Sequence, residues 1–438
     1  MSDFKLLSED DKEENRTPAV SVYSHHTDVL NEASAISCYT NLTNTIIGSG
    51  VLGLPFAIAN TGLVLGILLL VASGVLAFFS LHLLSISASK IPSPASFYAV
   101  TEASVPQLTF LIDLAVTVQC FGVCSSYLIV VGGLMPDVVL QLGITDGFFT
   151  EKYPWILLAF AVVAPLSCFQ KMDALKFTSS LSVSFVLFLM VMVFLYALDI
   201  DSMDPCRDKG VGDDDGECVG DMPMFSLESN AFRVLSIFVF AFSCQTNMFA
   251  VVNELENPSQ KRFDTITSSA VLSAGSVYIV VAIAGFLTYG TEVDANILVS
   301  YPKTTLTTVA RICVSLLVSF SYPILFLPGR TSVMGLWRGF DKDKQAYITN
   351  NAFRYSLVTI GLLGGSLATA LLVEDLGLIF GLVGATGATI ISFILPGISY
   401  YKMPDNLKSE PEWKRTCALL LCILGLVIMP VCTTFLFL

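Results

Sequence analysis

Long apolar blocks separated by short polar connections make up most of this sequence. Eleven of these blocks are at least as long as the run of about 17 residues that a membrane-spanning helix needs. The pattern predicts an all-α membrane protein with eleven transmembrane helices. The blocks cover residues 36–58, 63–88, 108–140, 153–169, 175–198, 230–253, 265–289, 304–327, 352–372, 376–400 and 414–437.

Composition supports this interpretation. Of the 438 residues, 54% are hydrophobic and 13% are charged, whereas soluble domains carry about 25% charged residues. Residues 1–35 are polar and acidic, and we expect a disordered tail there because they have little apolar surface to bury. Residues 36–438 form the transmembrane domain, interrupted by an acidic loop at 199–229. The tail and this loop supply much of the net charge of −13, which indicates no nucleic-acid partner.

The distribution of basic residues orients the chain. Cytoplasmic connections are enriched in Lys and Arg, and 17 of the 23 basic residues lie on the cytoplasmic side if the N-terminus is cytoplasmic. The acidic loop would then face the outside or a lumen. Cys206 and Cys218 in that loop can form a disulfide in such a compartment. The alternative is a pair of free thiols.

The sequence carries no motif that favours an enzyme. It contains no His-Glu-x-x-His, no cysteine–histidine metal set and no phosphate-binding Walker sequence. His82 is the one histidine inside an apolar block, and we interpret it as a packing residue rather than a proton relay. A serine protease built from Ser49 and His82 is disfavoured because Ile47 replaces the glycine that its motif requires.

Two apolar blocks are interrupted. The first contains "NTIIGSGVLGLP", and each glycine in a helix interior costs about 1 kcal/mol relative to alanine. This stretch is either a small-residue packing face or a break that lines a cavity. The sixth block contains "VFAFSCQTNMFAVVNEL", with polar residues at mid-depth. Interruptions five blocks apart predict a five-plus-five inverted repeat with a central binding site.

Several segments resemble one known family. "NLTNTIIGSGVLGLPFAIANTG" (41–62), "SLHLLSISASK" (80–90), "FAFSCQTNMFAVVNELENPSQKR" (240–262) and "GATGATIISFILPGISYYK" (384–402) resemble the amino acid/auxin permease family. The segments are most similar to the sodium-coupled neutral amino acid transporters of system A and N and to vacuolar amino acid transporters. The resemblance implies a LeuT-type fold, with ten core helices and an eleventh appended.

The resemblance also implies a binding site. Backbone amides at the first break would bind a substrate carboxylate, and carbonyls at the second would bind the α-ammonium group. The implied substrate-binding residues are Ile47, Gly48, Ser49, Gly50, Phe240, Ser243 and Gln245. The implied sodium ligands, if sodium is used as the coupling ion, are Asn44, the Ile47 carbonyl and Ser321, and no other cofactor is expected.

The sixth block departs from the system A and N pattern. Those relatives carry a His and, two residues later, a Glu, at the positions of Gln245 and Asn247. Neither residue here titrates, which leaves open whether sodium or protons drive transport. A carboxylate elsewhere, such as Glu254 or Glu102, remains a candidate for proton coupling.

The sequence therefore predicts a secondary-active transporter of small, neutral amino acids, working by alternating access and coupled to a sodium or proton gradient. The alternative is an amino-acid-sensing receptor that transports little. A channel is disfavoured because the sequence shows neither rings of like residues nor a re-entrant filter. The expected partners are the amino acid and the lipid bilayer of a plasma, vacuolar or lysosomal membrane. The sequence predicts no oligomeric state.

Overall fold

The computed structural model describes most of the predicted transmembrane domain. In the described ranges the chain consists of helices joined by turns and irregular connections, with one isolated β-bridge between Ala33 and Leu255. Residues 1–32 of the predicted disordered tail, and residues 199–202 and 207–217 of the acidic loop, lie outside the described residues. The residues that the structure describes are 33–145, 147–168, 176–198, 203–206, 218–340, 351–403 and 411–438.

Helices occupy all eleven predicted blocks. Eight are long and apolar enough to span a membrane, a bent pair gives a ninth, and α6 and α7 are shorter apolar helices within the described ranges. That all eleven cross the membrane stays a prediction. The helices in the eleven blocks are α1 (Ala35–Ile46) with α2 (Gly50–Thr61), α3 (Leu63–Ser89), α5 (Thr109–Gln141), α6 (Lys152–Cys168), α7 (Lys176–Ala197), α8 (Ser229–Ala241) with α9 (Gln245–Glu254), α10 (Gln260–Tyr289), α12 (Thr305–Phe340), α14 (Asn351–Leu372), α15 (Leu376–Val383) continuing to α16 (Leu395–Lys402), and α17 (Glu412–Leu436).

Polar residues at the block edges set where several helices begin. The side chains of Ser34, Ser259 and Asp375 each accept a hydrogen bond from the backbone N–H three residues later. Such N-caps satisfy one of the amide groups that a helix start leaves without an intrahelical partner. Short connecting helices, α4 (Phe97–Ser104) and α11 (Ile297–Ser300), precede the third and eighth spans.

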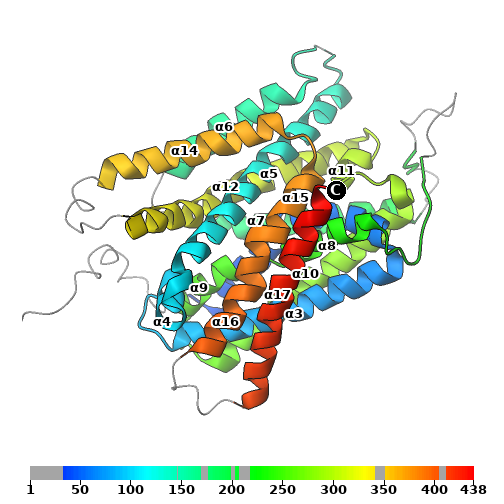
Figure 1. Cartoon of the computed structure of the whole chain (residues 1–438). Helices are drawn as coiled ribbons and strands as arrows, with labels where there is room; N and C mark the ends of the chain where they lie inside the picture. The colour runs from blue at the N-terminus through cyan, green and yellow to red at the C-terminus, as the bar shows by residue number, and fades with distance from the viewer. Residues whose placement is uncertain are drawn as a thin grey trace, which may run out of the picture.

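Spans that are five apart in the sequence pack against each other. Helix α2 contacts α8, α3 contacts α10, α5 contacts α12, and α6 contacts α14. Figure 1 shows the last pair side by side, with α14 running along α6. This pairing agrees with the predicted five-plus-five repeat. Helix α17 is the appended element and packs along α16 (Figure 1).

The repeat pairs gather into two groups of helices. The first, or bundle, consists of α1–α2, α3, α8–α9 and α10, and the second, or scaffold, consists of α5, α6, α12 and α14. The fifth and tenth spans touch members of both groups. The two interrupted spans therefore belong to one body, which packs beside the other.

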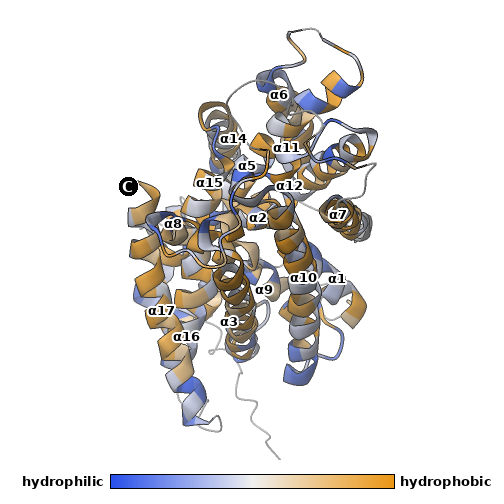
Figure 2. Cartoon of the chain, turned by 90° about the vertical axis from the view of Figure 1, so that its right-hand side faces the viewer, coloured by the Kyte–Doolittle hydropathy of each residue, from blue (hydrophilic) through white to orange (hydrophobic). Residues whose placement is uncertain are grey.

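The outer surface is apolar. The side chains of Leu68, Leu272 and Ile360 are 60%, 70% and 68% exposed. In Figure 2, hydrophobic colouring predominates along α3 and most of α17. Exposed apolar surface of this extent suits contact with hydrocarbon rather than water.

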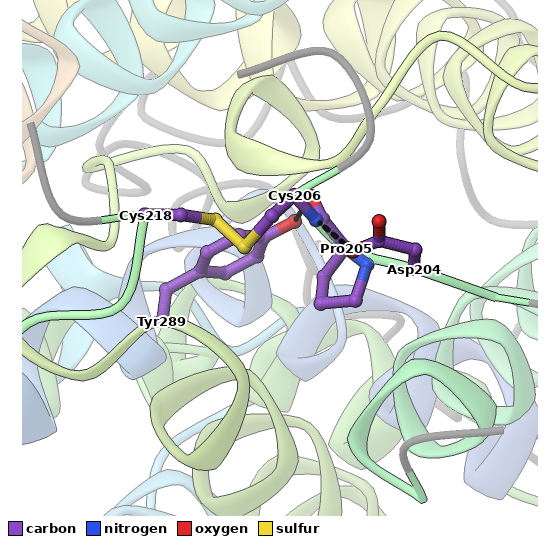
Figure 3. Close-up of a disulfide and its surroundings, with 5 residues drawn as sticks. All are labelled: Asp204, Pro205, Cys206, Cys218 and Tyr289. Atoms are coloured by element: carbon purple, nitrogen blue, oxygen red, sulfur yellow. Dashed lines mark hydrogen bonds between the residues drawn. A yellow bond between two sulfur atoms is a disulfide. The ribbon is translucent and has the colours of Figure 1, made fainter. Parts of the chain in front are cut away.

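A disulfide joins Cys206 and Cys218, as predicted, with their Cα atoms 5.8 Å apart. The ring of Tyr289, at the end of α10, lies beside it, and the Tyr289 hydroxyl donates to the Pro205 carbonyl at 3.3 Å (Figure 3). Past the disulfide, the amide of Gly220 donates to the Tyr289 carbonyl at 3.0 Å. Both sides of the acidic loop are thus anchored to the same helix end.

Candidate functional site

The first predicted interruption is a break in the helix. Helix α1 ends at Ile46, α2 begins at Gly50, and their axes differ by 48°. Ile47 leaves the helical region with ψ of 50°, and the Gly48 amide turns back to the Ile46 carbonyl at 2.8 Å. The glycine–serine stretch therefore interrupts the helix. Of the two alternatives for this stretch, the structure agrees with the break and not with an unbroken packing helix.

The second interruption is milder. Helix α8 ends at Ala241 and α9 begins at Gln245. The Ser243 amide donates to the Phe240 carbonyl, and the Asn247 amide donates to the Cys244 carbonyl, both at 3.0 Å. The two halves together form one apolar span, whereas α1 and α2 bend by more than 40°. The two breaks occupy corresponding spans but differ in geometry.

Glycine brings the two breaks into contact. A Cβ added at Gly50 would lie 3.0 Å from the Cα of Ala241, so any larger residue would require the two half-helices to move slightly apart. A Cβ added at Gly48 would lie 3.3 Å from the hydroxyl oxygen of Tyr127, a buried residue of α5. The scaffold therefore reaches the break through Tyr127, a residue that the sequence interpretation missed.

Tyr278 links the two breaks. This residue of α10 is 0% exposed, and its hydroxyl is hydrogen-bonded to the Ile46 carbonyl and lies 2.8 Å from the Ala241 carbonyl. Ile46 and Ala241 are the last residues of α1 and α8, and such terminal carbonyls form the negative end of a helix dipole. The sequence interpretation missed Tyr278, a lone tyrosine in an apolar block.

The positive ends of two half-helices lie at the same breaks. Helices α2 and α9 begin at Gly50 and Gln245, and the first amides of a helix have no intrahelical acceptor. Ser49 precedes α2, is 2% exposed, and its hydroxyl has no hydrogen-bond partner among the described residues. An unpartnered buried hydroxyl next to helix-start amides suits an anionic ligand such as a carboxylate.

The predicted residues Ser243 and Gln245 belong to a buried polar network. The Gln119 amide on α5 donates to the Ser243 hydroxyl at 2.5 Å. The hydroxyl of Ser392 donates to the Gln245 side-chain oxygen at 2.8 Å, and the Gln245 amide nitrogen lies 3.5 Å from Ser80. The Gln245 side chain therefore bonds to neighbouring helices. Gln119, another residue missed from sequence, keeps a buried oxygen without a partner in the described part of the chain.

Phe240 contributes an apolar wall. Its ring stacks on Phe380 of α15 with 5.0 Å between centroids, and its carbonyl accepts the Ser243 amide. A Cβ at Gly53 would lie 3.0 Å from the same Phe380 ring. The half-helices α2 and α8 thus share one aromatic neighbour beside the breaks.

The tenth span is irregular where it meets the site. It contains two π-helical segments, η4 (Gly384–Ala388) and η5 (Ile390–Ile394). A Cβ at Gly384 would lie 2.1 Å from the Ser236 carbonyl of α8, so glycine permits the close contact. Wide turns of this kind are frequent at functional sites.

The side chains of the predicted sodium ligands are partly buried. Asn44 lies near the end of α1 and Ser321 lies in α12, and both are half-buried. Amide, hydroxyl and carbonyl oxygens suit a hard cation. The described residues contain no group of three or more His, Cys, Asp or Glu side chains that could hold a metal. Sodium binding at these residues stays a prediction.

Asn247, at the position where the system A and N relatives carry a Glu, is hydrogen-bonded to α1 of the bundle. Its amide donates to the Thr45 hydroxyl and to the Asn41 side-chain oxygen, the latter at 3.3 Å. Helix α9 is thereby bonded to α1 just before the first break. His82 has a partner as well, because its Nδ1 lies 2.7 Å from an Asp264 carboxylate oxygen of α10.

Two interrupted helices whose ends meet in a buried, partly unsatisfied polar centre define the class of membrane transporters with discontinuous helices. Comparison with known proteins narrows the class. The chain belongs to the family described as transmembrane amino acid transporter protein, whose model matches residues 31–438.

Similar proteins include Vacuolar amino acid transporter 5 of Schizosaccharomyces pombe, 33% identical over 92% of this chain and 94% of that protein. Sodium-coupled neutral amino acid transporter 4 of Homo sapiens is 25% identical over 89% and 81% of the two chains. The fold resembles that of the nucleobase-cation-symport-1 family transporter MHP1 in a closed conformation, with a TM-score of 0.57, 12% identity and coverage of 92% and 93%. The relatives are named as transporters, in agreement with a protein that is not an enzyme.

Proposed function

We propose that this protein is a secondary-active transporter of small, neutral amino acids that works by alternating access. The observation that carries the proposal is the meeting of two helix breaks, with helix-start amides and the unpartnered Ser49 hydroxyl next to helix-end carbonyls at Tyr278. Donors beside acceptors suit a zwitterion, which presents a carboxylate and an ammonium group together.

The carboxylate would bind at the Ser49–Gly50 end, where the α2 amides and the Ser49 hydroxyl are donors. The ammonium group would bind the carbonyls that end α1 and α8. These half-helix ends carry partial charges of opposite sign, so they favour one orientation of the substrate. Family membership supports an amino acid as the ligand.

The surroundings favour a small, neutral side chain. The side chains around the breaks include Tyr127, Phe240, Phe380 and Gln119, and none of these four is charged. A charged substrate side chain would need a partner of opposite charge in a site of low dielectric constant. The 3.3 Å approach of a Gly48 Cβ position to Tyr127 also limits the available room.

Transport would follow from relative motion of the two helix groups. The bundle carries both breaks, and the scaffold contributes Tyr127 and Gln119, so rocking one group against the other would open the site to alternate sides. Sodium held by Asn44, the Ile47 carbonyl and Ser321 would order the same unwound segment that binds substrate. Ion and substrate would then raise each other's affinity by the same factor. A proton gradient is the alternative driving force.

Uptake into proteoliposomes tests this function. The purified protein would be assayed with radiolabelled alanine, glutamate and lysine, under an inward sodium gradient and a proton gradient applied separately. We expect saturable alanine uptake that depends on one of the two gradients and exceeds uptake of the charged amino acids. Alanine binding without uptake under either gradient would refute transport and support an amino acid receptor.

A further inference from the structure

A cavity of about 380 Å³ lies between α3 and α10. Its walls come from these two helices and its floor is Phe242, from the break between α8 and α9. The volume falls in the range of small-molecule pockets, which is about 300–1,000 Å³. We call this cavity the α3–α10 crevice. Its lining includes Gly74, Phe78, Val271, Gly275 and Phe242.

Two glycines keep the crevice open. A Cβ added at Gly74 would lie 3.2 Å from the Phe242 ring, and one added at Gly275 would lie 3.7 Å from it. Larger side chains at either position would therefore fill the space above the ring. The crevice exists because each of the two facing helices has a glycine at the same level.

The crevice is continuous with the lipid-facing surface. Its rim includes Val71, Val75 and Leu272, which are all exposed. Its serine hydroxyls are used within α10, since Ser268 donates to the Thr265 carbonyl and Ser276 to the Leu272 carbonyl. A hydrocarbon chain from the bilayer therefore leaves neither of these hydroxyl protons without an acceptor.

Two aromatic rings connect the crevice to the site. Phe242 packs edge-on against Tyr278, with 5.2 Å between ring centroids and 73° between ring planes. The Tyr278 hydroxyl in turn holds the Ile46 and Ala241 carbonyls at the two breaks. A group packed against Phe242 in the crevice would therefore affect the position of Tyr278, which is hydrogen-bonded to both helix ends.

We propose that the α3–α10 crevice binds one acyl chain of a membrane phospholipid, and that this chain supports Phe242 and Tyr278 in the arrangement that holds the breaks together. Because an acyl chain leaves one apolar environment for another, van der Waals contact with the crevice walls supplies the attraction. The effect of the chain on amino acid affinity rests on the proposed transport function, but occupancy of the crevice does not.

Photo-labelling tests occupancy. The protein would be reconstituted with a phosphatidylcholine that carries a diazirine in its acyl chain, and labelled residues would be mapped by mass spectrometry after irradiation. Phe242 is only 3% exposed, so a chain that stays outside cannot reach it. We expect label on Phe242 in addition to the rim. Label confined to the exposed rim residues Val71, Val75 and Leu272 would overturn the proposal.

Filling the crevice provides a matched comparison. We expect Gly275→Leu to lower labelling of Phe242 about tenfold, equivalent to about 1.4 kcal/mol, with the milder Gly74→Ala as a second variant. Gly361→Leu is the control, because a Cβ there meets nothing within 4 Å and the residue lies on the exposed face of α14. Undiminished labelling of Phe242 in both crevice variants would overturn the proposal, as would displacement of the label by cholesterol but not by unlabelled phosphatidylcholine.

Amino acid uptake measured in the same liposomes separates the two proposals. Label on Phe242 without saturable uptake would support the acyl-chain site and refute transport. Uptake without label on Phe242 would support transport and refute the acyl-chain site. If both hold, we expect Gly275→Leu to change the half-saturating amino acid concentration more than Gly361→Leu does.

Discussion

Removing the Tyr278 hydroxyl should weaken substrate binding by separating the two helix breaks. Tyr278→Phe keeps the ring and its edge-on contact with Phe242, and it deletes the one oxygen that bonds the Ile46 and Ala241 carbonyls. A tyrosine hydroxyl has a single proton to donate. The two carbonyls therefore share it, and both lose their side-chain donor in the variant.

The expected magnitude follows from burial. Tyr278 is 0% exposed, so bulk water does not reach the point where its hydroxyl meets the two carbonyls. The Ile46 carbonyl keeps the Gly48 amide as a donor, whereas loss of the side-chain donor to the buried Ala241 carbonyl costs about 1–3 kcal/mol. If substrate binding requires the paired helix ends, this cost corresponds to a loss of affinity of about 5- to 150-fold, because about 1.4 kcal/mol is tenfold.

Equilibrium binding of radiolabelled alanine to purified protein, by scintillation proximity, measures the change. Tyr289→Phe is the control, since it also removes a tyrosine hydroxyl from α10 but one that bonds Pro205 near the disulfide. We expect the control to bind alanine within about twofold of the unmodified protein, because neither break carbonyl contacts its hydroxyl. Equal alanine affinity of Tyr278→Phe and the unmodified protein would refute the reasoning, whatever the change in thermal stability.

Three further substitutions test other parts of the structure. Gly48→Leu should abolish alanine binding while the protein still inserts, because its side chain would meet the Tyr127 hydroxyl, 3.3 Å from the Cβ position; normal uptake by this variant would disprove the broken-helix site. Ser321→Ala should weaken the sodium dependence of uptake by removing a proposed hydroxyl ligand, and unchanged sodium affinity would favour protons or other ligands. Cys206→Ser should lower the midpoint of thermal unfolding, since the disulfide spans 12 residues and a loop of about 15 is worth about 3 kcal/mol; the alanine dissociation constant should stay the same, and a large change in it would place the loop in the site.

The sequence sufficed for those features that depend on local composition. An apolar block in a chain with 13% charged residues has one low-energy solution in a bilayer, a helix that satisfies its own backbone hydrogen bonds. The block limits were therefore predictable. The break at Gly48–Gly50 was predictable only from its glycines together with the polar interruption five blocks later, because the glycines alone also fit a packing face. The disulfide was predictable because Cys206 and Cys218 share one polar loop.

The residues that complete the site required the tertiary structure. Tyr278, Tyr127 and Gln119 lie 229, 78 and 70 positions from Ser49 along the chain, on other helices. Nothing in their own blocks distinguishes them from ordinary packing residues. Their roles arise only when α10 and α5 pack against the breaks and bring the hydroxyls to Ile46, Ala241 and Gly48.

The same reason explains Gln245 and the α3–α10 crevice. From sequence, Gln245 is a polar residue in the break and a candidate to bind substrate, whereas the structure bonds its side chain to Ser392. Gly74 and Gly275 are unremarkable singly, and they form a crevice only because two distant helices place them over one ring. Local backbone preference and hydrophobicity follow directly from the sequence, but the packing of the helices decides which side chains come into contact.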